Sequence, residues 1–178
     1  MMKKAIRILA ALLLGILVLS ACGSDVVIID KTTAVPDSGT DGFVFVTEGK
    51  SGKLEIRVDA LMAPILEALG EPLQYFEAAS CAFNGLDKMY TYAHYEIDTY
   101  PQADGDRVSS IFFRDDLIKT PEGLAIGSTK AEMEKLYGTA YTVKGTELRY
   151  EKNGMFLKII VKDDRVASIT YASRVLDD

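Results

Sequence analysis

The sequence predicts an α+β fold made of two tandem repeats. In each repeat a helix precedes a three-stranded antiparallel meander, and the helices pack on one face of the sheet. One hexapeptide occurs twice, as DRVSSI at 106–111 and as DRVASI at 164–169, so equivalent positions differ by 58 in the numbering (164 − 106). A helical pattern that ends at a glycine, Gly70 or Gly138, precedes each copy. Apolar and polar residues alternate in the segments between, as they do in half-buried strands.

The second repeat, 119–178, shows this pattern most clearly. Thr129 followed by Glu132 has the spacing of a capping box, so a helix should begin there. Alternation then predicts three strands, with turns at Lys152–Gly154 and at Asp163–Asp164. The predicted unit is a helix followed by a meander.

The first repeat, 43–118, contains a leading hairpin, a helix over 59–69 and a second meander. Pro64 is compatible with this helix only if it falls in the first turn. The offset between the two glycines is 68 (138 − 70), against 58 for the hexapeptides, so the first copy holds ten extra residues within 76–88. We expect the two repeats to pack as one body, because a unit of about 50 residues buries too little surface to be stable alone.

Each hexapeptide is interpreted as a turn followed by the start of a strand. Val108 and Ile111 are three residues apart, as are Val166 and Ile169, so strict alternation places the two members of each pair on opposite faces unless a bulge intervenes. Ile111 and Ile169 are the members expected to face the helices. The repeat therefore describes architecture rather than two catalytic motifs.

The N-terminal segment 1–21 is typical of a lipoprotein signal peptide. Lys3, Lys4 and Arg7 precede an uncharged apolar run over 8–19. This run is shorter than the about 20 residues that a membrane-spanning helix needs. The segment LSAC, at 19–22, resembles the lipobox of bacterial lipoproteins, which implies that Cys22 carries a lipid anchor. The expected location is the extracytoplasmic face of the cell membrane. An ordinary secretory peptide remains the alternative.

Residues 22–42 are predicted to form a flexible tether, since Ser, Thr, Gly, Asp and Pro dominate the part from Lys31 onward. The whole chain has a formal charge of −6. The leader holds three of the 20 basic residues and none of the 26 acidic ones, so the chain from Cys22 onward carries 17 − 26 = −9. Anionic headgroups should repel such a domain, and nucleic acid is excluded as a partner because no basic stripe is present.

Two segments resemble known families. GLAIGSTKAEMEKLYG, 123–138, resembles the helix-opening signature of small outer-membrane assembly lipoproteins, and a tandem of such units is similar to the fold of the β-lactamase inhibitor protein. SCAFNGLDKMYTY, 80–92, resembles uncharacterised lipoproteins of Gram-positive gut bacteria. The resemblance implies a noncatalytic protein-binding module.

The residues indicate no catalytic site, cofactor or metal. The single histidine, His94, is placed at a hairpin tip, and no nucleophile, zinc or phosphate-loop motif occurs. Asp98, Asp104 and Asp106 are a weak candidate for calcium, but their spacing lacks the regularity of a calcium loop, and solvated turn acids are favoured. Cys81 lies among small and apolar residues, and burial is favoured over a reactive or intermolecular role.

Four tyrosines, Tyr90, Tyr92, Tyr100 and Tyr150, are the candidate binding residues. On an open sheet face they would anchor a protein or glycan partner. Packing in the core with the hydroxyl groups at its rim is an equally weighted alternative.

The function expected from the sequence is a membrane-tethered, noncatalytic module for protein binding or envelope assembly. It would hold the membrane through Cys22 and bind a protein whose identity the sequence does not give. The alternative is an envelope hydrolase whose site is not recognisable from sequence.

Overall fold

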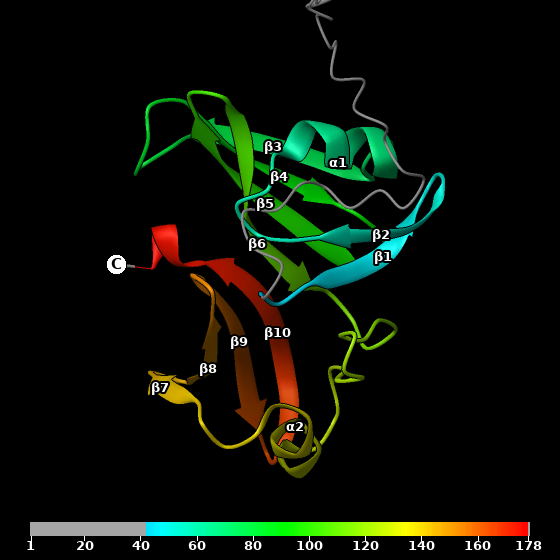
Figure 1. The fold of residues 1–178 in the computed structure, drawn as a ribbon, viewed down its shortest axis with the longest axis vertical. Helices are drawn as coiled ribbons and strands as arrows, with labels where there is room; N and C mark the ends of the chain where they lie inside the picture. Colours follow the sequence, from blue (N-terminus) through cyan, green and yellow to red (C-terminus); the bar gives the residue numbers. More distant parts are fainter. Residues whose placement is uncertain (1–41, 178) are drawn as a thin grey trace, which may run out of the picture.

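The computed structural model describes residues 42–177 (Figure 1). The predicted signal peptide, Cys22 and the tether up to residue 41 lie outside the described residues. The described chain begins with a hairpin of β1 (Phe45–Gly49) and β2 (Gly52–Ile56). Gly52 follows the two-residue turn with a φ of 111°, a conformation that favours glycine.

One antiparallel sheet of eight strands forms most of the molecule. Its order is β3-β4-β5-β6-β10-β9-β8-β7, so the second four strands mirror the first four across the β6–β10 pair. The strands are β3 (Gln74–Ala79), β4 (Leu86–Thr91), β5 (Tyr95–Gln102), β6 (Gly105–Phe113), β7 (Thr142–Lys144), β8 (Glu147–Lys152), β9 (Met155–Lys162) and β10 (Arg165–Ser173).

The two halves of this sheet are related by an approximate twofold axis. In the β6–β10 pair Phe112 lies directly opposite Thr170, and these are equivalent positions of the two repeats (112 + 58). Farther out, Gln74 pairs with Thr91, and Thr142 pairs with Arg149 at the equivalent place. Each repeat therefore supplies four strands to one sheet, and not the three that the sequence predicts.

Both hexapeptides contain a β-bulge at the same position. The β5–β6 register moves from Asp98↔Ser110 to Thr99↔Val108, which leaves Ser109 as the extra residue. The β9–β10 register shifts in the same way at Ala167. The expectation of opposite faces is consequently wrong, because the bulge turns both apolar side chains of each hexapeptide inward. Four buried residues result, namely Val108, Ile111, Val166 and Ile169.

The two helices are α1 (Met62–Leu69) and α2 (Lys130–Tyr137). Pro64 falls in the first turn of α1, where a proline is tolerated. Helix α2 has the predicted capping box: the Thr129 hydroxyl accepts a hydrogen bond from the Glu132 amide at 3.2 Å, and the Glu132 carboxylate accepts one from the Thr129 amide at 2.7 Å. Helix α1 has no side-chain cap, so other contacts must fix where it begins.

The arginine of each hexapeptide supplies such a contact. Arg107 Nη1 donates to the Asp59 carbonyl oxygen at 2.6 Å, and Arg165 Nη1 donates to the Gly127 carbonyl oxygen at 2.8 Å. Asp59 and Gly127 both have positive φ, 64° and 89°, at the bend before the helix. Each repeat also pairs the backbone of this bend with the valine of its hexapeptide. The duplicated DRVxSI motif thus joins the last strand of a repeat to the start of its helix.

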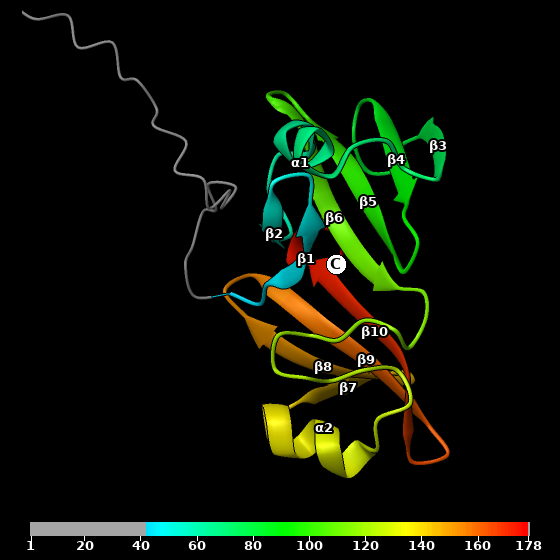
Figure 2. The same cartoon turned by 90° about the vertical axis from the view of Figure 1, so that its right-hand side faces the viewer.

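The predicted α+β class is wrong, because the described residues form mainly antiparallel sheet. The two helices have eight residues each, and α2 buries only Met133. They do not form a layer that covers the sheet. Much of that cover comes from the hairpin and the connector, through Phe45, Leu54 and Leu124. The hairpin lies between α1 and α2 along the molecule (Figure 2).

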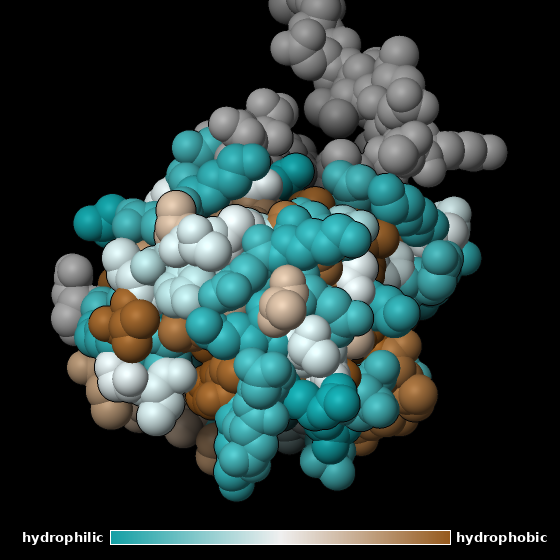
Figure 3. All heavy atoms as spheres, turned by 90° about the horizontal axis from the view of Figure 1, so that it is seen from below, coloured by the Kyte–Doolittle hydropathy of each residue, from teal (hydrophilic) through white to brown (hydrophobic). Residues whose placement is uncertain are grey.

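A short 3-10 turn, η1 (Arg174–Leu176), follows β10. It lies near the middle of the long axis, where the two repeats meet (Figure 1). None of its residues is buried. Seen along that axis from the α2 end, the surface is mainly hydrophilic, with smaller hydrophobic areas between the hydrophilic ones (Figure 3).

Candidate functional site

The four candidate tyrosines do not form an exposed surface. Tyr90, Tyr100 and Tyr150 are at most 6% exposed, and Tyr92 is half-buried. The Tyr92 hydroxyl donates to the Gly70 carbonyl oxygen at 3.2 Å, and the Tyr150 hydroxyl donates to the Gly138 carbonyl oxygen at 2.6 Å. These two tyrosines are equivalent (92 + 58), and each holds the C-terminal end of its helix. The burial of the candidate tyrosines matches the alternative interpretation, in which they pack in the core.

Burial also changes the acidity of these tyrosines. Desolvation by burial is the main cause that raises the pKa of Tyr92 and of Tyr150 to about 12. The Tyr100 hydroxyl donates to Asp59 Oδ1 at 2.7 Å. All four phenols are therefore neutral at pH 7 and have structural roles.

His94 lies in the turn between β4 and β5, as predicted. Its Nδ1 is 2.7 Å from Asp115 Oδ2, and this hydrogen bond is the main cause that lowers the pKa of Asp115. Among residues 42–177 no group of three His, Cys, Asp or Glu side chains is arranged to hold a metal ion.

The three acidic residues weighed as a calcium site have separate partners. Asp104 pairs with Arg107 at 2.5 Å, and Asp106 pairs with Lys88 at 2.7 Å. Asp98 is not a solvated turn residue: it lies on β5, half-buried, and accepts a hydrogen bond from the Ser110 hydroxyl at 2.7 Å.

The prediction that Cys81 is buried is wrong, because its side chain is exposed. It lies in the loop at the tip of the β3–β4 hairpin. The small and apolar residues around it indicated a core, but they belong to a hairpin that projects from the first repeat.

This hairpin contains the ten extra residues of the first repeat. Phe76 pairs with Met89, and the chain from 77 to 88 lies between them; at the equivalent place in the second repeat Lys144 pairs with Glu147, and only 145 and 146 lie between. The insertion adds three residue pairs, from Glu77↔Lys88 to Ala79↔Leu86, and a longer loop. Sequence spacing located the insertion but did not show that it is a strand extension. The alternation of QYFEAA was too weak to indicate one.

Strand β3 is an edge strand whose six residues are all exposed. One side of it pairs with β4, and among the described residues no strand pairs with the other side. Large apolar side chains lie on this open edge and directly before it. Leu73 is 71%, Phe76 61% and Tyr75 50% exposed. Edge strands of soluble proteins are usually protected by charge, proline or cover, and an apolar one is a template for pairing with another chain.

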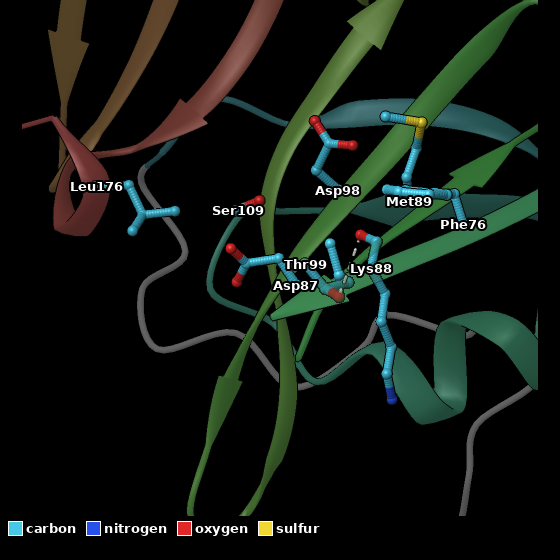
Figure 4. Close-up of a pocket in the computed structure, with 9 residues that line it drawn as sticks. Phe76, Asp87, Lys88, Met89, Asp98, Thr99, Ser109 and Leu176 are labelled. Carbon is cyan, nitrogen blue, oxygen red and sulfur yellow. Dashed lines mark hydrogen bonds between the residues drawn. The ribbon is translucent and has the colours of Figure 1, made fainter. Parts of the chain in front are cut away.

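A pocket of 280 Å³ lies beside this edge on the outer face, which is the sheet face opposite the core. Met89, Asp98 and Ser110 form one cross-strand row of that face. In Figure 4 Asp87, Asp98, Thr99 and Ser109 lie between Leu176 on one side and Met89 and Phe76 on the other. The lining consists of Phe76, Ala78, Asp87, Lys88, Met89, Asp98, Thr99, Ser109 and Leu176.

The polar part of this pocket is acidic. Burial is the main cause that raises the pKa of Asp98, and the charges of Glu96 and Asp87 raise it further, against the Ser110 hydrogen bond. The ammonium group of Lys88 points away from the other lining residues (Figure 4) and pairs with Asp106. The pocket thus combines apolar walls with two carboxylates.

Fold and site define the class of protein. It is an antiparallel β protein of two repeats related by an approximate twofold axis, with an apolar edge and an acidic pocket in the first repeat. No family model matches the chain, and no curated protein sequence matches it. Among the described residues no helix is long and apolar enough to cross a membrane.

A solved structure is similar to this fold. It is an extracellular protein containing an SCP domain from Bacillus anthracis str. Ames, with a TM-score of 0.51 and 10% sequence identity. The match covers 65% of this chain and 44% of that protein, so the chain spans less than half of its length. At this identity the likeness concerns the fold alone.

Proposed function

We propose that the protein is a membrane-tethered, extracytoplasmic binding module that adds an extended segment of a partner protein to β3. The single observation that carries this proposal is the open edge of β3, whose six residues are all exposed and include the large apolar side chains of Tyr75 and Phe76. Strand addition satisfies the open backbone groups of such an edge, while pockets beside it select the side chains of the partner.

Charge complementarity identifies the kind of segment. Asp87 and Asp98 line the pocket beside the edge, and the chain from Cys22 onward carries a charge of −9 (17 − 26). A bound segment should alternate apolar side chains with Lys or Arg, because a long basic side chain can lie along Phe76 and Met89 while its charge reaches the carboxylates.

Two further observations support the proposed location at the extracytoplasmic face of the membrane. The segment from Met1 to Cys22 has the pattern of a lipoprotein leader. The similar fold belongs to a protein described as extracellular. The lipid at Cys22 would keep the module at the extracytoplasmic face of the membrane, with residues 22–42 as its spacer.

The alternative is an envelope hydrolase in which Asp98 is a general acid beside Asp87. A volume of 280 Å³ lies just below the about 300 to 1,000 Å³ of usual small-molecule sites. The pocket also opens beside an unpaired strand edge. Both features favour a site for one side chain of a longer segment.

A photo-crosslinking experiment on the full lipidated chain in intact envelopes tests the site. A photoreactive residue replaces Leu73 beside β3 or, as the matched control, Val143 in β7 at the opposite edge of the sheet. Both positions are exposed, at 71% and 64%. We expect one discrete adduct from position 73 and none from position 143. Equal adducts from both would contradict the proposal.

Selection from a random heptapeptide phage library, with the full chain in detergent micelles, tests the chemistry of the segment. Selected peptides should alternate apolar and basic residues, and they should lose affinity for Phe76→Ala but not for Val143→Ala. Selection of acidic peptides, or of peptides that bind Phe76→Ala as tightly as wild type, would overturn the proposed segment and its site.

A further inference from the structure

The outer face of the second repeat carries a basic cluster. Arg149 on β8 lies directly opposite Lys158 on β9, and only 9% and 18% of their side chains are exposed. Like charges opposite each other destabilise a sheet, and more so when they are shielded from water. This pair therefore needs a neighbouring anion.

Asp177, which follows η1, is that anion. Its carboxylate accepts hydrogen bonds from Lys158 Nζ at 2.6 Å and from Arg149 Nη1, and its backbone oxygen accepts one from Lys144 Nζ at 3.2 Å. Burial opposes the charge of Asp177, but the hydrogen bond from Lys158 and the nearby cations outweigh it, so its pKa lies below the usual value. Glu147 also pairs with Arg149, which leaves one net positive charge on these five side chains.

The residue before Asp177 belongs to the other repeat's site. Leu176 forms one wall of the acidic pocket, opposite Phe76 and Met89 (Figure 4). Residues 174–177 thus bridge the two halves of the outer face. Asp177 is fixed in the basic half, and Leu176 stands in the acidic half.

Polar contacts rather than apolar burial hold this segment. Val175 and Leu176 are 51% and 44% exposed, and no residue of η1 is buried. The other contacts are the Arg174 amide to the Gly154 carbonyl oxygen at 3.0 Å, the capping Ser173 hydroxyl and an exposed ion pair of Arg174 with Glu151. The segment can therefore leave the sheet without opening the hydrophobic core.

We propose that residues 174–177 are a latch on the acidic pocket, in which Asp177, bound by Arg149 and Lys158, holds Leu176 across the pocket and restricts access to it. This inference rests on the proposed function of the β3 edge and the pocket beside it. A carboxylate of the partner could take the place of Asp177 on the basic cluster. Release of Asp177 then opens the pocket.

The position of Leu176 can be measured without any ligand. The chain contains no tryptophan, so Leu176→Trp places a single reporter on the latch of the full chain. Adding Asp177→Asn should raise acrylamide quenching of this tryptophan toward the value of free N-acetyltryptophanamide. Lys158→Met should act in the same direction. Asp163→Asn, the same change at an exposed turn acid, is the control. Quenching equal to the control in both variants would overturn the latch.

Peptide affinity provides the second measurement. If the open state is populated at about 10% in the free protein, Asp177→Asn should tighten binding of the selected heptapeptides about tenfold, with no change for Asp163→Asn. Equal affinity in wild type and Asp177→Asn would contradict the latch. If neither binds a peptide, the proposed function fails, whereas the quenching result still decides whether the segment is a latch.

Discussion

Tyr171 and Phe113 occupy equivalent positions in the two repeats (113 + 58) and pack with a centroid distance of 6.1 Å. Tyr171 is 1% exposed, and its hydroxyl has no hydrogen-bond partner among the described residues. An unpaired buried polar group costs about 1 to 3 kcal/mol. Tyr171→Phe should therefore raise the free energy of unfolding by about 1 kcal/mol in urea denaturation. A clear loss of stability would show that the hydroxyl has a partner.

Asp98 predicts a pH-dependent effect on stability. Its folded-state pKa lies above the ordinary 3.8 because of burial and the charges of Glu96 and Asp87. The folded form resists losing the proton, so this residue destabilises the protein increasingly as the pH rises above 3.8 through the raised pKa. Asp98→Asn, which can still accept the Ser110 hydrogen bond, should be more stable than wild type at pH 7. Urea denaturation at several pH values checks this. A difference that persists below about pH 3 would contradict it.

Single residues were predicted unequally well from the sequence. The capping box at Thr129 and Glu132 depends on local spacing alone, and it formed as predicted. The burial of Cys81 and the faces of Val108 and Ile111 depend on how a hairpin projects and where a bulge falls. Tertiary structure sets both, so residue patterns did not show them.

At the scale of elements, the hexapeptide arginines offer a paired test. Arg107 and Arg165 each hydrogen-bond the carbonyl oxygen of the bend before a helix. Arg107→Ala and Arg165→Ala should each lower the free energy of unfolding by about 1.5 to 3 kcal/mol, the usual range for a hydrogen bond to a charged group. The exposed Lys162 is the control, and Lys162→Ala should be nearly neutral. A loss at one arginine only would contradict their equivalent roles.

The error in fold class also arises at this scale. Helical periodicity located both helices, but it could not show that they have eight residues each. Strands β3 and β7 were not predicted, because one is entirely exposed and the other has three residues, so neither shows a clear alternation. With them, each three-stranded meander becomes half of an eight-stranded sheet.

At the scale of the whole molecule, the duplication was visible in the sequence, but the twofold relation was not. The glycine and hexapeptide spacings predict two repeats. Nothing in them shows that Phe112 and Thr170 lie opposite each other. The candidate site depends on the ten-residue insertion of the first repeat, because that insertion extends the β3–β4 hairpin beside the pocket.

Membrane attachment is a prediction for residues outside the described part of the chain. Cys22→Ala should release the protein into the soluble fraction or leave an uncleaved precursor, since the thiol is the expected acceptor of the lipid. Fractionation with detergent partitioning measures this, with Cys81→Ser as the control. Normal processing and unchanged partitioning of Cys22→Ala would contradict the lipid anchor.

The central claim is that a partner adds a strand to β3, and amide hydrogen exchange tests it most directly. On binding of a selected heptapeptide, backbone amides within Gln74–Ala79 should exchange more slowly, because their open edge becomes paired. Amides within Thr142–Lys144, at the opposite edge, should not change. Slower exchange at β3 alone is the result that strand addition predicts. Protection at β7, or none at β3, would contradict it.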